Sequence, residues 1–341
     1  MIRLRTMARL SMLASAVAVL TASTVLPLRA DDEMLQIRSR LISTFKVGSD
    51  QTRFGDFEFV GGLELSSSSA ALGAMSAIRL SADRHRFLGV MDTGFWYAGR
   101  LERDPDGVPT GITDFSVSPI LDKDGESSDQ KWRVDAEGLA LRGDEVLVSF
   151  ERQSRVDIYP ANAPGNSRPL GSLPLQIPLN ELRNNRGLEA IMVAPDASPL
   201  AGEVVVVSEK SLNTNGDIYA AVLTGPSKGV FFVKRHAPYD VTDGDFLPNG
   251  DLLLLERRFS IAEGIGMRIR RIEGSRLVPG NLVDGPVLLE ADFGDQIDNM
   301  EGLDVSTDEA GQTFVTLVSD DNHSILQRNL VLEFRYLGDN K

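Results

Sequence analysis

Acidic side chains recur along this 341-residue chain at the ends of short apolar segments. In five segments, a small turn carrying an acidic or hydroxyl residue leads into an apolar strand, and a second apolar strand ends in an acid. Carboxylates bind hard cations and accept protons, so acids gathered from several segments can hold a metal ion or act as general bases. The first residues of the five pairs are Ser76, Glu137, Glu189, Asp243 or Asp245, and Glu301; the second are Asp92, Glu151, Glu209, Glu256, and Asp320 with Asp321.

The spacing of these residues predicts the fold. The first members lie about 50 to 60 residues apart, the length of a propeller blade of about four short strands. Continuous apolar runs of strand length, such as 203–208, 251–256 and 313–319, alternate with turn residues, and convincing helical periodicity is absent. We therefore predict an all-β chain folded as a single β-propeller.

The number of blades depends on the two ends of the mature chain. Residues 31–70 and 325–341 hold further strand-like runs. These ends either form a blade of their own or share one, which closes the ring and removes exposed sheet edges. We prefer six blades, with five and seven as alternatives. Residues 95–134, rich in Asp, Gly and Ser, are predicted to form a long loop over one face.

In a propeller, equivalent residues of every repeat fall on a ring around the central channel. Several carboxylates on one ring cannot remain charged and close together unless some take up protons or a cation neutralises them. The chain has no Cys and three His, so oxygen ligands are expected, and these favour a divalent cation such as Ca²⁺, ahead of Mg²⁺. The predicted metal ligands are Glu137, Glu189, Glu301, Asp320 and Asp321.

Four further residues are predicted to take part in catalysis. Glu209 or Glu256 is a candidate general base, and Arg152 or Arg257 is a candidate for stabilising developing negative charge. The alternative for any single acid is structural: it fastens one blade to the next by accepting backbone N–H bonds.

Residues 1–30 are predicted to be a signal peptide. Three Arg precede the uncharged, largely apolar segment 10–26, and Leu28-Arg29-Ala30 offers a cleavage site. Residues 31–341 then form the propeller domain, which we expect to be periplasmic or secreted, monomeric and without membrane attachment after cleavage. Removing the four Arg of the leader changes the net charge from −14 to −18, which disfavours nucleic acid as a partner.

Several of these repeat ends resemble the family called "esterase-like activity of phytase". The resemblance rests on 185–190 (NRGLEA), 254–260 (LLERRFS), 298–303 (DNMEGL) and 318–322 (VSDDN), and on 135–139 (DAEGL) with 149–152 (SFER). It spans nearly all of residues 31–341. The sequence departs from the family pattern at Ser76-Ala77, where a Ser-Gly pair is common.

The resemblance implies an exported bacterial protein that hydrolyses carboxyl or phosphate esters. Joined to the predicted ring of acids, it indicates a hydrolase of a small-molecule ester or phosphate ester that uses a divalent cation in a carboxylate-lined funnel. Two alternatives stay open. One is a non-catalytic ligand-binding or scaffold propeller, and the other is a metal-assisted sugar-lactone hydrolase.

Overall fold

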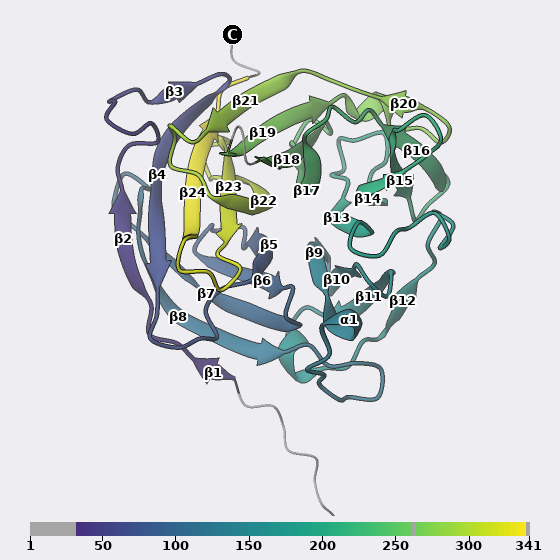
Figure 1. Ribbon diagram of the computed structural model, residues 1–341, viewed down its shortest axis with the longest axis horizontal. Helices are drawn as coiled ribbons and strands as arrows, with labels where there is room; N and C mark the ends of the chain where they lie inside the picture. The colour runs from purple at the N-terminus through teal and green to yellow at the C-terminus, as the bar shows by residue number, and fades with distance from the viewer. Residues whose placement is uncertain (1–31, 261–263, 339–341) are drawn as a thin grey trace, which may run out of the picture.

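The computed structural model describes residues 32–260 and 264–338, so the predicted signal peptide lies outside the described residues. Five antiparallel sheets surround a common axis as the blades of a propeller (Figure 1). The prediction of an all-β propeller is confirmed. The blade number is five, one of the two alternatives, and not the preferred six.

Each blade runs outward from an inner strand beside the axis. From the axis outward, blade 1 is β5 (Met75–Leu80), β6 (Arg86–Met91), β7 (Phe95–Arg103), β8 (Pro109–Pro119) and β1 (Glu33–Met34). Blade 2 is β9 (Ala136–Arg142), β10 (Glu145–Phe150), β11 (Arg155–Pro160) and β12 (Gly171–Leu173). Blade 3 is β13 (Leu188–Val193), β14 (Val204–Leu212), β15 (Ile218–Val222), β16 (Gly229–Val233) and the parallel β20 (Leu282–Val283).

The last two blades complete the ring. Blade 4 is β17 (Asp240–Phe246), β18 (Leu252–Ser260), β19 (Gly264–Ile272) and β21 (Val287–Asp292). Blade 5 is β22 (Asn299–Thr307), β23 (Thr313–Asp320), β24 (Asn329–Tyr336), β4 (Phe57–Ser66) and β2 (Arg38–Ile42), with β3 (Arg53–Phe54) beside β4. The short helices are α1 (Lys131–Val134), η1 (Pro164–Asn166) and η2 (Gly274–Arg276).

The two ends of the chain share blade 5, and this explains why there is no sixth blade. β4, from the N-terminal part, pairs with the C-terminal β24 over eight residues, from Asn329 opposite Leu65 to Tyr336 opposite Phe57. The N-terminal strands therefore complete the sheet that β22–β24 begin. This pairing closes the ring by hydrogen bonds and leaves no unpaired edge at the junction.

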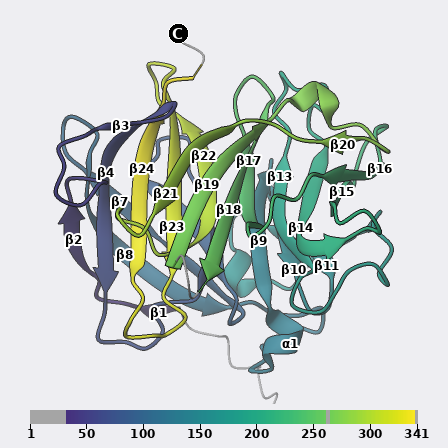
Figure 2. The same cartoon turned by 45° about the horizontal axis from the view of Figure 1, so that its top comes forward.

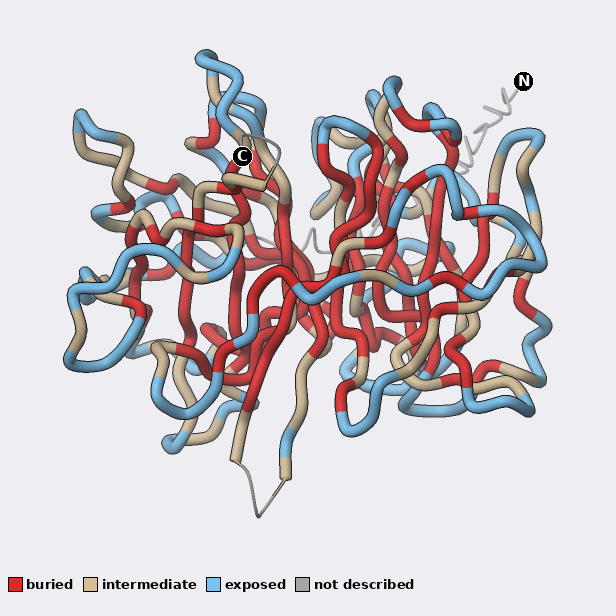
Figure 3. The backbone as a smooth tube through the Cα atoms, turned by 90° about the horizontal axis from the view of Figure 1, so that it is seen from above, coloured by how far each residue is buried: buried red, intermediate tan, exposed pale blue. Residues whose placement is uncertain are grey.

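Five apolar clusters, one between each pair of neighbouring blades, form the core. Leu317 of blade 5 packs with Leu253 of blade 4, for example, and Met75 of blade 1 packs with Leu63 of blade 5. Figures 2 and 3 show the buried strands standing around the axis, with exposed residues concentrated in the connections at the two faces. The inner strands β5, β9, β13, β17 and β22 each contact the next around the ring.

The expected long loop at 95–134 is largely sheet. Residues 95–119 form β7 and β8, whose Trp96, Tyr97 and Phe115 are buried, and only the segment before α1 is irregular. Asp114, Ser116 and Ser118 lie within β8, among the buried Ile112, Phe115 and Val117. No helix in the described ranges is long and apolar enough to span a membrane.

Candidate cation and substrate cavity

Every inner strand carries a β-bulge at the same level of the channel. At each one the pairing register with the second strand of the blade shifts and passes over one residue. A bulge of this kind re-aims a side chain out of the regular alternation. The five bulged residues, in blade order, are Ser76, Glu137, Glu189, Thr242 and Glu301.

This register corrects the predicted ring at one blade. The sequence placed Asp243 or Asp245 beside Ser76, Glu137, Glu189 and Glu301, but the bulged residue of blade 4 is Thr242. Thr242 is buried and donates its hydroxyl proton to the carbonyl of Met300, at 3.1 Å, so it joins blade 4 to blade 5. A bulge leaves no signal in the pattern of apolar residues, so the predicted register of blade 4 was wrong by one residue at Asp243.

A second ring lies beside the first. In each blade, the residue before the bulge pairs with a residue of the second strand, and the residue that follows this partner belongs to the second ring. It holds four acids and one cation, because blade 4 supplies Arg257 where the prediction had Glu256. All five residues line one cavity of about 190 Å³. The second ring is Asp92, Glu151, Glu209, Arg257 and Asp320.

The cavity lining is strongly acidic. Eight carboxyl groups face three cationic side chains, and the other lining groups are one Ser and two Asn. Among the residues that the structure describes, it therefore holds a large excess of formal negative charge. The acids are Asp92, Asp135, Glu137, Glu151, Glu189, Glu209, Glu301 and Asp320, and the cations are Lys131, Arg152 and Arg257.

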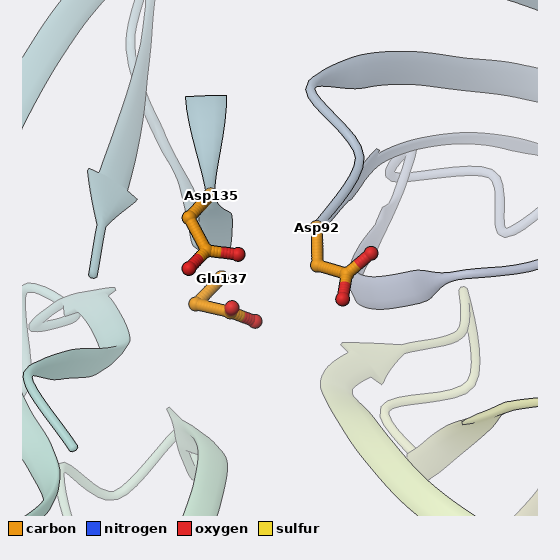
Figure 4. Close-up of side chains that lie close together, drawn as sticks. All are labelled: Asp92, Asp135 and Glu137. Atoms are coloured by element: carbon orange, nitrogen blue, oxygen red, sulfur yellow. The ribbon is translucent and has the colours of Figure 1, made fainter. Parts of the chain in front are cut away.

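Three of these acids form the tightest group. Asp92, Asp135 and Glu137 each offer a carboxylate oxygen, and these oxygens all lie within 4.8 Å of one another (Figure 4). Lys131 binds Asp92, and its Nζ lies 3.4 Å from Asp135 Oδ1. Arg152 Nε lies 2.8 Å from Asp135 Oδ2. Asp135 is buried, and its Oδ1 accepts no hydrogen bond among the described residues. The group therefore retains an oxygen with unused bonding capacity.

Glu137 and Glu189 are the most perturbed acids of the cavity. Burial raises the pKa of both carboxyls well above the ordinary value, and neighbouring acids raise it further, first Asp135 for Glu137 and first Glu137 for Glu189. Neither carboxyl accepts a hydrogen bond from any residue in the described ranges. Without a cation, burial and repulsion from neighbouring acids both favour the protonated form of these two groups.

On the opposite side of the cavity, Glu301 meets the one cation of the second ring. Arg257 Nη2 lies 3.2 Å from Glu301 Oε1, and Asn299 Nδ2 donates to the same oxygen at 2.7 Å. Burial raises the pKa of Glu301 to about 7, against the lowering effect of Arg257 and with a further rise from Asp320. Burial opposes the charge of Arg257, but Glu301, Glu189 and other acids outweigh it and raise the pKa of the guanidinium.

Three acids of the second ring, Glu151, Glu209 and Asp320, also have raised pKa values. Burial raises the pKa of Glu151 to about 7 although Gly187 N donates to its Oε1 at 3.1 Å. It raises the pKa of Asp320 to about 6, where the main opposing effect is a backbone bond from Asn322 at 2.8 Å. The pKa of Glu209 is also raised by burial, against the nearby Arg257. Several groups thus exchange protons near neutral pH, as general bases must.

Two predicted site residues lie outside this cavity. The Glu256 carboxylate is buried beside two Arg side chains, 2.6 Å from Arg268 Nε and 2.5 Å from Arg270 Nη2. Asp321 accepts from Asn329 Nδ2 at 2.8 Å and from the backbone of His323 at 3.0 Å. Neither carboxylate belongs to the cavity lining. The interpretation of Glu256 as a general base and of Asp321 as a ligand is therefore withdrawn.

The recurring Glu-Gly pair has a packing reason. A Cβ on Gly138, next to Glu137, would strike the backbone carbonyl of Glu189 in the neighbouring blade. Ser149 Oγ accepts from Gly138 N at 2.9 Å and donates to the same Glu189 carbonyl at 3.1 Å. Two cavity acids are thus fixed relative to each other by one hydroxyl. Gly302 takes this place in blade 5, where a Cβ would lie 3.1 Å from Ala77 Cα and 3.2 Å from the Ser76 carbonyl of blade 1.

Other lining residues were not predicted as site residues. Asp135 was noted only as the start of a repeat; it lies between α1 and β9, two residues before the bulge at Glu137. Asn185 and Asn322 have left-handed backbone conformations, with φ of 55° and 47°, which Asn tolerates in turns. Lys131 comes from α1 at the cavity mouth, and no repeat signals it.

The fold and the cavity define a class: a five-bladed β-propeller with a carboxylate-lined axial cavity. The model of the phytase-like family, described as "Esterase-like activity of phytase", matches residues 70–323. The chain belongs to this family. No curated protein matches it. Among solved structures, it is similar to the PQQ-bound form of an aldose sugar dehydrogenase from Streptomyces coelicolor, with 10% identity, a TM-score of 0.39, and coverage of 88% of this chain and 98% of the other.

Proposed function

We propose that this protein is a hydrolase that binds a divalent cation in the acidic cavity and cleaves a small-molecule ester or phosphate ester there. The observation that carries the proposal is the charge of the lining: eight carboxyls face three cations around about 190 Å³. Such a lining is neutralised by protons or by a cation, and its oxygen ligands are those that Ca²⁺ prefers, with Mg²⁺ second. Membership of a family described by esterase-like activity supports ester cleavage.

The residues suited to hold the cation are Asp92, Asp135 and Glu137, whose ligand oxygens lie within 4.8 Å of one another. Glu189 belongs to the same lining, and its pKa responds to Glu137. A bound cation supplies Lewis acidity toward the ester oxygen and makes a coordinated water more acidic. Glu301 and Asp320, the other predicted ligands, face Arg257 and Asn322 and complete the far wall.

Other polar side chains of the cavity are suited to proton transfer, to substrate binding and to positioning a metal ligand. Glu209 lines the cavity with a pKa that burial raises, so its carboxylate is a stronger base toward water than an exposed one. Arg257 lines the cavity with a side chain that is 31% exposed, so its guanidinium is placed to bind an anionic oxygen of the substrate. Arg152 is engaged with Asp135 at 2.8 Å and is better placed to hold that ligand than to meet substrate. Arg152 is therefore a positioning residue in this proposal.

Purified protein tests the proposal. After exhaustive chelation, hydrolysis of para-nitrophenyl acetate and para-nitrophenyl phosphate is measured without metal, with Ca²⁺ and with Mg²⁺. We expect at least one ester to be cleaved with Ca²⁺ and no cleavage by the chelated protein. Glu209→Gln should lower kcat while calorimetric Ca²⁺ affinity stays within about threefold, because a base outside the tightest acid group contributes mainly in the transition state.

Two results would overturn the proposal. Unchanged hydrolysis after full metal removal would exclude the cation, and Ca²⁺ binding without turnover on carboxyl esters, phosphate esters or lactones would favour a ligand-binding propeller. A lactone panel also separates the sugar-lactone alternative. We further propose export to the periplasm or medium as a monomer, and mass spectrometry of the secreted chain, which should begin at Asp31, checks the cleavage.

A further inference from the structure

A second and larger concavity, of about 790 Å³, opens beside the acidic cavity between blades 4 and 5. Arg257 and Asn322 line both spaces, so the two are adjacent and meet at these side chains. We call this second space the side groove. Its described walls come from the end of β18 and the start of β19, from the β21–β22 connection, and from the β23–β24 connection.

Large apolar side chains from four segments converge on the side groove while exposed to solvent. Phe293 is 81% exposed, Phe259 73%, Leu326 87% and Val47 62%. Phe293 also stands within 4.0 Å of the position that a Cβ on Gly264 would take, so it leans over the start of β19. An apolar patch of this kind next to a polar cavity is typical of a ligand groove.

The walls of the side groove are held in place by polar bonds behind the apolar surface. Arg328 Nη1 donates to Gln296 Oε1 and its Nη2 to the carbonyl of Ile297, both at 2.8 Å. Val47 N donates to the carbonyl of Gly294 at 3.1 Å, next to Phe293. The groove is therefore largely preformed, which lowers the ordering cost of binding.

The charged groups of the side groove are mostly engaged with protein partners. Arg328 lies 3.4 Å from Asp298, and Arg257 binds Glu301 and Asn299. Together with the acidic cavity, this arrangement disfavours a substrate that carries many phosphates. It suits a molecule with one anionic or ester head and one apolar tail.

We propose that the side groove binds the apolar tail of an amphipathic ester or phosphate ester whose head lies in the acidic cavity at the Arg257 border. The occupant follows from the adjacency of the two spaces at Arg257 and Asn322 and from the cation that Arg257 places at this border. The assignment of the head rests on the proposed function. The assignment of the tail rests on the groove itself.

The experiment uses n-alkyl phosphonates of one, four, eight and twelve carbons as probes, since they carry head and tail but are not hydrolysed. Binding to the folded protein is measured by calorimetry with and without Ca²⁺. We expect affinity to rise with chain length in the wild type. Phe293→Ser and Phe259→Ser should each weaken the twelve-carbon probe about tenfold and leave the one-carbon probe unchanged. Leu179→Ser is the matched control, because Leu179 is 66% exposed and lies outside the groove.

The outcomes separate the two proposals. Affinity independent of chain length, or a Phe293→Ser protein that still prefers the long probe, would overturn the groove and leave a Ca²⁺-dependent head site intact. Chain-length dependence that survives while neither Ca²⁺ nor Glu137→Gln affects binding would uphold the groove and contradict the proposed function. An equal loss with Leu179→Ser would show that the effect is not local and would also overturn the groove.

Discussion

Two groups of acids lie along the same axis, and they differ in what neutralises them. The acidic cavity holds eight carboxyls around open space. Further along the inner strands β5, β17 and β22, the carboxyls of Asp243, Asp245 and Asp304 surround a single cation, Arg79; Asp245 is partly buried and the other three are buried. We call this second group the channel plug. The same residue type thus meets two environments along one axis.

In the channel plug, donors from the protein reach the acids. Arg79 Nη1 lies 3.1 Å from Asp243 Oδ2, and the same guanidinium donates to the carbonyls of Leu303, Ile191 and Gly244 at 2.7, 3.2 and 3.1 Å. It therefore ties blade 1 to blades 3, 4 and 5. Backbone N–H groups complete the set: Leu303 N donates to Asp243 at 2.9 Å, as the structural alternative for propeller acids predicts.

The other two plug acids behave similarly. Asp245 accepts from Val305 N at 2.9 Å, and Asp304 accepts from Leu80 N at 3.2 Å. Burial, with Asp245 nearby, raises the pKa of Asp304 to about 8, so this carboxyl holds a proton at neutral pH. One guanidinium, one proton and backbone donors serve the plug, although Asp304 Oδ2 has no hydrogen-bond partner within the described ranges. The acids of the cavity surround open space instead, and that difference separates a binding site from a fastening.

Arg79→Met should produce the largest effect on stability. It leaves the buried Asp243 and the partly buried Asp245 without their cation, and breaking a buried pair in this way costs about 3–5 kcal/mol. The free energy of unfolding, from urea titration, measures the loss. Arg142→Met is the control: Arg142 pairs with Glu145 on a partly exposed strand end, and such a pair contributes about 0–1 kcal/mol.

If the plug and the cavity are independent, the Arg79→Met protein that remains folded should still bind Ca²⁺ in the cavity. Ca²⁺ affinity per folded molecule should stay within about threefold of wild type, since distant sites act independently. A loss of affinity as large as the loss of stability would mean that the plug and the cavity are one unit.

Glu137→Gln and Glu256→Gln should have opposite consequences. Glu137 has no donor in the described chain, so its removal relieves repulsion and should leave stability equal or higher, while Ca²⁺ affinity falls about tenfold or more. Glu256 is held by two buried Arg side chains, so Gln there should cost about 3 kcal/mol and leave Ca²⁺ affinity unchanged. Thermal unfolding and calorimetry are measured on both variants. Equal stability losses would contradict the distinction drawn here.

The sequence revealed the propeller because repeats of equal length leave a regular signal, and it revealed most of the ring because Glu137, Glu189 and Glu301 begin equivalent strands. It could not supply the register of blade 4, where a bulge at Thr242 and the Arg257 that follows Glu256 decide which side chain meets the axis. A shift of one residue turns a strand's side chains to the other face.

The side groove and the blade count could not be predicted from the sequence for another reason. Phe259, Phe293 and Leu326 stand in three separate connections, and only closure of blades 4 and 5 brings them together. The blade count depended on whether the N-terminal strands form a sheet or join one, and the pairing of β4 with β24 is a long-range choice that no local pattern expresses.

The cavity should make the stability of the metal-free protein depend on pH. Folding raises the pKa of Glu151 and Glu301 to about 7, above an unfolded value of about 4.3. A group whose pKa is higher in the folded state binds its proton more tightly there, so the bound proton stabilises the fold. This stabilisation is fully present below the unfolded pKa and is lost as the pH rises through the folded pKa. The free energy of unfolding should therefore fall by about 4 kcal/mol between pH 5.5 and pH 8, about 2 kcal/mol from each of these two groups.

Saturating Ca²⁺ should flatten this dependence, because a cation replaces the protons that the cavity otherwise takes up. Asp304 of the plug titrates near pH 8, so the part of the slope that Ca²⁺ leaves unchanged reports the plug. Glu301→Gln should remove part of the slope in the metal-free protein. A slope of the reverse sign would contradict the pKa shifts of the cavity acids.

Lys131→Met should give the smallest effect and the most specific one. Lys131 binds Asp92 and lies 3.4 Å from Asp135 Oδ1, so its ammonium stands among the oxygens assigned to the cation and competes with it. Removing this charge should tighten Ca²⁺ binding by about three- to tenfold, since Lys131 is half-exposed and its charge is partly screened. Lys123→Met, at an exposed Lys that pairs with Asp124 outside the cavity, should leave the affinity unchanged. If Lys131→Met instead weakened Ca²⁺ binding, the three acids would serve as partners for Lys131, and the acidic cavity would resemble the channel plug more closely than the comparison allows.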